Sequence, residues 1–131
     1  MTEQHKWEEA LDAYTRALEL NPQLTQCMYN KGKLLMLLDD EQSVAEAQAL
    51  FERALELRPD EPKICEAMGE LLSGQHDFQR SVEYYLNAAS KYPDDKYKRR
   101  AMDNARMTYS KQSHQSGQTA NIDEWVERFA S

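Results

Sequence analysis

The spacing of three prolines constrains the fold of this chain more than any other feature of its sequence. Pro22, Pro59 and Pro93 end similar sequence segments and lie 37 and 34 residues apart. Each is preceded by an aromatic residue eight positions earlier and by small residues five and twelve positions earlier; these are Tyr14, Phe51 and Tyr85, then Ala17, Ala54 and Ala88, then Ala10, Ala47 and Ser81. Gly32 and Gly69 each lie ten residues after the preceding proline. Self-similarity at such a period is typical of a repeat architecture.

Helical periodicity fills the segments between these prolines. One apolar stripe at i, i+3, i+4 and i+7 spacing comprises Trp7, Ala10, Leu11, Tyr14, Ala17 and Leu18. The pattern predicts six helices, at about 5–20, 24–38, 42–57, 62–73, 77–91 and 95–111. We expect Asp60 to be an N-cap, with Pro62 in the first turn of its helix. With only four glycines and four prolines, the chain has too few turn residues for a β-sandwich or barrel of this size.

The pattern resembles the tetratricopeptide repeat family over about residues 6–111. The resemblance implies an all-α fold, a right-handed α-solenoid of antiparallel helix pairs with about three repeats. Residues 1–111 would form this domain, as a half repeat (1–22), two repeats (23–59 and 60–93) and a capping helix (94–111). The longer first spacing implies three inserted residues, which either a loop at 39–43 or longer helices would absorb. The half repeat lacks a first helix, or the chain is a fragment of a longer array.

The C-terminal residues have a different pattern. The polar stretch 112–121 is typical of a flexible linker. Residues 122–131 then predict a short amphipathic helix, with Asn121 as its N-cap and an apolar stripe of Ile122, Trp125, Val126 and Phe129. We expect this helix to pack on one of the last repeat helices. The alternatives are a homodimer formed through this stripe or through an exposed N-terminal edge that includes Trp7 and Leu11, and a disordered tail.

Charge and composition exclude several functions. The net charge of −7 disfavours nucleic acid as a partner, and the absence of an apolar run of about 18 residues predicts no membrane insertion. Two cysteines without a CxxC motif, Cys27 and Cys65, fit a reducing compartment, so we expect a cytoplasmic protein. His5, His76 and His114 lack partners at metal-ligand spacing. We therefore expect no catalytic, metal or cofactor site, and no enzyme.

The resemblance implies a concave groove that binds a peptide or helix of a partner protein. Carried over residue by residue, the groove comprises Gln26, Tyr29, Asn30, Lys33, Lys63, Glu66, Glu70, Arg100 and Asn104. We expect a non-enzymatic adaptor or scaffold, with Asn30, Lys33, Lys63 and Arg100 orienting the partner. A basic run on the last repeat helix, Lys96, Lys98, Arg99, Arg100 and Arg106, would contact an acidic peptide or only face solvent.

Two alternatives stay open. The chain would be a self-associating subunit of a larger complex if its apolar end faces, rather than its groove, make the contacts. It would be a co-chaperone if it bound a chaperone's C-terminal Glu-Glu-Val-Asp tail. Asn30 and Lys63 match two of the five residues that such family members use, and Ala67 stands where they have arginine.

Overall fold

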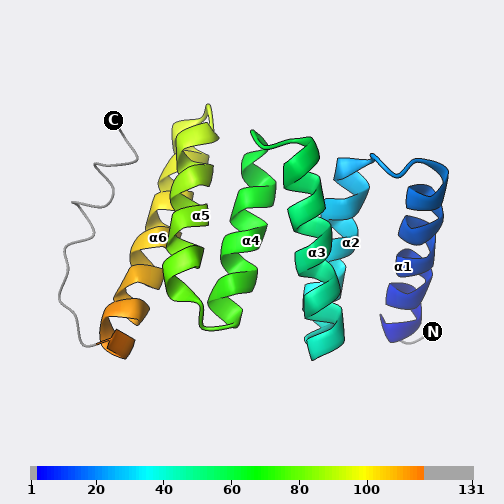
Figure 1. Ribbon diagram of the computed structural model, residues 1–131, viewed down its shortest axis with the longest axis horizontal. Helices are drawn as coiled ribbons and strands as arrows, with labels where there is room; N and C mark the ends of the chain where they lie inside the picture. The colour runs from blue at the N-terminus through cyan, green and yellow to red at the C-terminus, as the bar shows by residue number, and fades with distance from the viewer. Residues whose placement is uncertain (1–2, 117–131) are drawn as a thin grey trace. The chain divides into compact units, whose positions relative to one another are not determined.

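The computed structural model describes residues 3–116, and the side chains of residues 6–112 within them. All elements in that range are helices: α1 Glu3–Leu20, α2 Thr25–Leu38, α3 Glu41–Leu57, α4 Pro62–Gly74, α5 Phe78–Lys91 and α6 Asp95–Ser116. Short turns join them, and within α1–α3 and within α4–α6 consecutive helices run in opposite directions (Figure 1). The predicted all-α fold is confirmed, with packed helix pairs as in an α-solenoid. The chain divides into two compact units, Met1–Pro59 and Asp60–Ser131.

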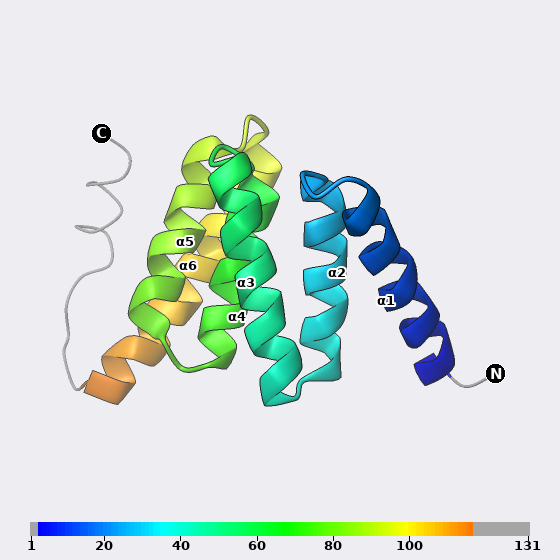
Figure 2. The same ribbon diagram turned by 45° about the vertical axis from the view of Figure 1, so that its right-hand side comes forward.

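The first unit contains α1, α2 and α3, with α2 packed between the other two (Figure 2). Its core lies between α2 and α3 and consists of Met28, Leu35, Ala47, Phe51 and Ala54. Gly32 makes this packing possible, because a Cβ built on it would lie 2.5 Å from Cε1 of Phe51. The ring therefore occupies the space that a side chain at residue 32 would need.

The α1 helix is covered less completely than the others. Trp7, Leu11, Tyr14 and Leu18 are all half-buried, and none of residues 6–20 is fully buried. Each of these four side chains therefore keeps part of its surface accessible.

The second unit contains α4, α5 and α6, and α5 contacts both of the other helices. Tyr85 lies against Gly69 as Phe51 lies against Gly32, with Tyr85 Cε1 2.9 Å from a Cβ built on the glycine. The buried Ser81 hydroxyl donates a 2.5 Å hydrogen bond to the Gly69 carbonyl. Val82, Tyr85 and Leu86 of α5 also form a buried cluster with Ala105 of α6.

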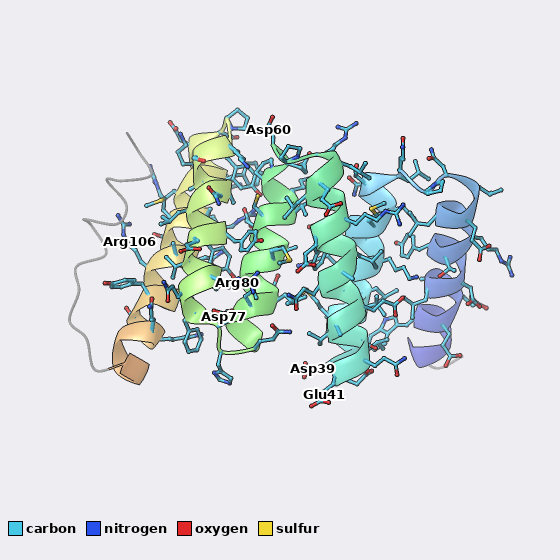
Figure 3. The ribbon with its side chains drawn as sticks, in the orientation of Figure 1. Asp39, Glu41, Asp60, Asp77, Arg80 and Arg106 are labelled. Atoms are coloured by element: carbon cyan, nitrogen blue, oxygen red, sulfur yellow. The ribbon has the colours of Figure 1, made fainter. Side chains whose placement is uncertain are left out.

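Side-chain caps define where α3 and α5 begin, each within one residue of the predicted start. The Asp40 side chain caps α3 by accepting 2.8 Å hydrogen bonds from the Ser43 N–H and hydroxyl. Asp77 caps α5, and its carboxylate lies 3.6 Å from Arg80 (Figure 3). The residues that precede these two caps, Asp39 and His76, have positive φ angles of 56° and 64°. Asp and His are among the residues that adopt this conformation most readily.

The structure decides one open alternative, on the inserted residues, and corrects two expectations, on the N-cap of α4 and on the start of the linker. The inserted residues lengthen helices rather than a loop, since only Asp39 and Asp40 separate α2 from α3, and α3 has 17 residues against 14 in α5. The N-cap of α4 is Glu61, not Asp60, because Pro62 occupies the first helical position and the cap is the residue before it.

The linker does not begin at residue 112, since α6 continues to Ser116. Residues 112–116 contain no glycine or proline that would end a helix. The predicted helix at 122–131, with its Asn121 cap and its apolar stripe, lies outside the described residues.

Candidate protein-interaction surface

Arg100, near the start of α6, is the centre of a side-chain cluster that joins α6 to α4. Its Nη2 donates to both carboxylate oxygens of Glu66, at 2.9 and 3.1 Å, and to the hydroxyl of Tyr92 at 3.3 Å. The pair is unevenly accessible, with the Arg100 side chain 51% exposed and that of Glu66 16%. Hydrogen bonds to an ionised partner are stronger than neutral ones. Glu66 therefore fixes where the guanidinium lies.

Two tyrosine rings support this guanidinium. The rings of Tyr92 and Tyr97 stack with centroids 5.5 Å apart and an interplanar angle of 28°. The Arg100 guanidinium carbon lies 5.0 Å from the Tyr97 centroid and 5.9 Å from that of Tyr92. Both distances are in the range of a cation–π contact. Tyr92 is buried while Tyr97 is 40% exposed, so an aromatic face with a cation above it reaches the surface.

The protonation states of this cluster are stable near neutral pH. Burial, followed by the neighbouring Glu66 carboxylate, raises the pKa of Tyr92 well above its usual value. The hydrogen bond that Arg100 donates to Glu66 raises the pKa of Arg100. The phenol therefore stays neutral and the guanidinium stays charged in any physiological compartment.

A shallow open depression lies beside this cluster on α6. It is lined by five residues at i, i+3, i+4, i+7 and i+8 spacing, which places them on one face of the helix: Lys96, Arg99, Arg100, Asp103 and Asn104. Asp103 pairs with Arg106 at 3.8 Å, and Arg100 pairs with Glu66. Lys96 and Arg99 are exposed and form no ion pair within residues 6–112.

The predicted groove residues divide between the two units. Gln26, Tyr29, Asn30 and Lys33 lie on α2 in the first unit, where Gln26 Nε2 donates to Asn30 Oδ1 at 3.2 Å and the Tyr29 ring lies 6.4 Å from that of Phe51. Lys63, Glu66 and Glu70 on α4 and Arg100 and Asn104 on α6 belong to the second unit. Within it, the structure brings Glu66 and Arg100 together.

The sequence predicted that Arg100 contacts the partner protein but did not reveal its contact with Glu66. The two residues lie 34 positions apart, which is the repeat spacing, so opposite charges one repeat apart were the available signal. Tyr92 was also missed, although it directly precedes the repeat-ending Pro93.

The cysteines show no features of a reactive site. Cys65 is buried, and the Cys27 thiol donates to the Tyr14 carbonyl at 3.4 Å. Burial raises the pKa of both thiols, which disfavours the nucleophilic thiolate. In the described part of the chain, no three His, Cys, Asp or Glu residues gather as metal ligands would, and no helix is long and apolar enough to cross a bilayer.

Consecutive packed helices, with the same glycine–aromatic contact in both units, define a helical repeat protein. The family model described as Tetratricopeptide repeat matches residues 25–61, which contain α2 and α3. Residues 25–61 therefore contain a tetratricopeptide repeat. These repeats generally mediate protein–protein interaction, and the family is typically non-enzymatic. A comparison with curated proteins found no match.

Proposed function

We propose that this chain is a non-enzymatic adaptor that binds a peptide or helix of a protein partner. The α4–α6 surface, formed by Glu66, Tyr97, Arg100 and Asn104, makes the main contact. The observation that carries this proposal is the Arg100 guanidinium held over the exposed ring of Tyr97. The free cysteines fit a cytoplasmic setting.

Pre-organisation is the physical reason for choosing this surface. Arginine and tyrosine are enriched among the residues that dominate binding energy at interfaces. Ordering a flexible side chain on binding costs about 0.5–1.5 kcal/mol. Arg100 avoids much of that cost because Glu66 and Tyr92 already hold it. The α2 residues Gln26, Tyr29, Asn30 and Lys33 offer a second contact region.

The test is affinity capture with the full chain as bait, followed by quantitative mass spectrometry. We expect Tyr97→Ala to reduce recovery of the specific partners at least about tenfold, as truncation of an interface anchor does. Tyr84→Ala is the matched control, because Tyr84 is a half-buried tyrosine on α5 that takes no part in the contacts of this cluster. Equal recovery by wild type and Tyr97→Ala, with both proteins folded, would refute the proposal for this surface.

Self-association as a subunit of a larger complex is the second candidate. The half-buried Trp7 and Leu11 on α1 support it. A monomeric mass for the wild type by light scattering would exclude it. A dimer converted to monomer by Trp7→Ser with Leu11→Ser would establish it. The charge reversals Lys33→Glu and Lys63→Glu would weaken partner binding by an adaptor but leave such an assembly unchanged.

Binding of a chaperone tail is a narrower alternative. Ala67 is 2% exposed, so residue 67 offers neither a cation nor an accessible surface to a carboxylate. A titration with a labelled peptide ending in Glu-Glu-Val-Asp tests this directly. Absence of saturable binding below about millimolar would exclude it, since that threshold corresponds to only about 4 kcal/mol of binding free energy.

A further inference from the structure

We propose that the depression on α6 binds an acidic segment of the partner protein, held by Lys96, Arg99 and Arg100 with Asn104 at its side. This inference rests on the proposed adaptor function and names the chemistry of the partner.

The charge balance of the depression is the first argument. Asp103 is matched by Arg106 and Glu66 by Arg100, which leaves Lys96 and Arg99 uncompensated within residues 6–112. The neighbouring carboxylates are those of Asp94 and Asp95 at the N-terminal end of α6, where Asp94 Oδ1 accepts the Lys96 N–H at 2.9 Å. The lining residues of the depression include three cations and one carboxylate, on a chain whose net charge is −7. Such local complementarity attracts acidic groups and fixes their register.

The geometry of Arg100 is the second argument. Only its Nη2 is engaged, by Glu66 and Tyr92, so Nη1 and Nε make no hydrogen bond with the described residues. A guanidinium has five N–H donors in a fixed plane. An incoming carboxylate can therefore accept from Arg100 without displacing Glu66.

The residue at position 103 explains why a polar segment suits this face better than another repeat helix. Gly32 and Gly69 lie ten residues after Pro22 and Pro59, and an aromatic ring of the next helix packs directly on each. Asp103 holds the same place after Pro93, and its side chain is 62% exposed. A helix packed here in the same way would bury that carboxylate, which is costly.

An acidic peptide fits the charges better than a nucleic acid or an anionic membrane. Both of those are extended polyanions that also face the protein surface outside the depression, where the net negative charge of the chain repels them. A short segment can place its carboxylates on the two or three cations of the depression and leave the rest of the acidic surface untouched.

The experiment is selection of random 12-residue peptides on the full chain, followed by fluorescence anisotropy with the selected peptides. The test variant is Lys96→Glu with Arg99→Glu. The matched control is Lys98→Glu with Lys111→Glu, which changes the net charge equally at two exposed α6 residues outside the depression. We expect acidic peptides to be enriched. We expect their binding to weaken at least about tenfold in the test variant and less than about threefold in the control.

Other outcomes overturn the inference in distinguishable ways. Selection of neutral or basic peptides would refute the acidic site and leave the adaptor function standing. So would acidic peptides whose binding is weakened equally by the test and control variants. Failure to select any binding peptide would refute both. Tighter binding of a single-stranded oligonucleotide or of phosphatidylserine vesicles, lost in the test variant alone, would assign the depression to a phosphate-bearing partner instead.

Discussion

Gly32 determines how closely α2 and α3 approach, and replacing it tests that packing. In Gly32→Ala the new Cβ would lie 2.5 and 2.7 Å from two atoms of the rigid, fully buried Phe51 ring. Overpacking of this kind costs about 1–3 kcal/mol. That exceeds the roughly 0.5–1 kcal/mol that alanine contributes over glycine within a helix. We expect a lower free energy of unfolding by urea denaturation.

Gly74→Ala is the matched control for this variant. A Cβ on Gly74 would meet nothing within 4 Å. The helix preference of alanine then acts alone, and stability should rise by up to about 1 kcal/mol. Equal effects of the two variants would show that Gly32 acts through backbone preference rather than through contact with Phe51.

Tyr85 makes stability sensitive to alkaline pH. Burial, with smaller contributions from Glu70 and Glu66, raises its pKa from its ordinary value to about 12. The unfolded chain releases this proton near pH 10, so deprotonation favours unfolding. The contribution of Tyr85 is complete below about pH 10 and is lost as the pH rises towards about 12.

Ultraviolet titration of the tyrosines measures this effect. The ionisation step that Tyr85→Phe removes should lie near pH 12, and the variant should lose less stability than wild type between about pH 10 and 12. If the ionisation step that disappears in Tyr85→Phe lies near pH 10 instead, the Tyr85 hydroxyl is solvated in the folded protein.

At the scale of helices, most of the fold was predictable from sequence because its determinants are local. Apolar periodicity and the repeat-ending prolines located all six helices within a few residues, except the end of α6. The N-cap of α4 was misplaced by one residue because Asp is the better capping residue, while Pro62 determines where that helix begins. The choice between a longer loop and longer helices depended on tertiary packing, which local preference does not determine.

Asp40 shows how one cap defines the start of α3. Its carboxylate accepts hydrogen bonds from the Ser43 backbone and hydroxyl, and these lower its pKa below the usual value. Protonation then occurs less readily in the folded protein, so the stabilisation is present above about pH 4 and is lost as the pH falls through the lowered pKa.

We expect Asp40→Ala to lower the melting temperature at pH 7, and Asp40→Asn to lower it less, since asparagine is also a good N-cap. Circular dichroism melts at pH 7 and pH 3 provide the measurement. The difference between wild type and Asp40→Ala should shrink at pH 3, and a difference that stays constant would exclude the charged cap as its source.

At the scale of the whole molecule, the interaction surface was less predictable than the fold. Family resemblance assigned Glu66, Arg100 and Asn104 to the groove, and these residues lie on α4 and α6. It did not reveal that Glu66 pairs with Arg100 or that Tyr92 and Tyr97 stack beside them. The Glu66–Arg100 contact depends on side-chain conformations on two helices, at residues 34 positions apart, and the tyrosine stack depends on the conformation of the turn between α5 and α6. The charge of the depression on α6 likewise depends on a side-chain contact, the pairing of Asp103 with Arg106.

The division into two units predicts unequal stability along the chain. Among the described residues, the second unit contains fifteen buried hydrophobic residues and the first contains five. Burial of apolar surface is the main stabilising contribution, and domains below about 70–80 residues are stable only when their cores are well packed.

We therefore expect the fragment 60–131 to stay helical and to melt cooperatively, while the fragment 1–59 is largely unfolded in isolation. Circular dichroism of the two fragments, compared with the full chain, provides the measurement. Stable folding of 1–59 alone would show that the half-buried residues of α1 stabilise the first unit more than their exposure implies. If instead neither fragment folds, the two units depend on each other, and the α4–α6 surface exists only in the complete chain.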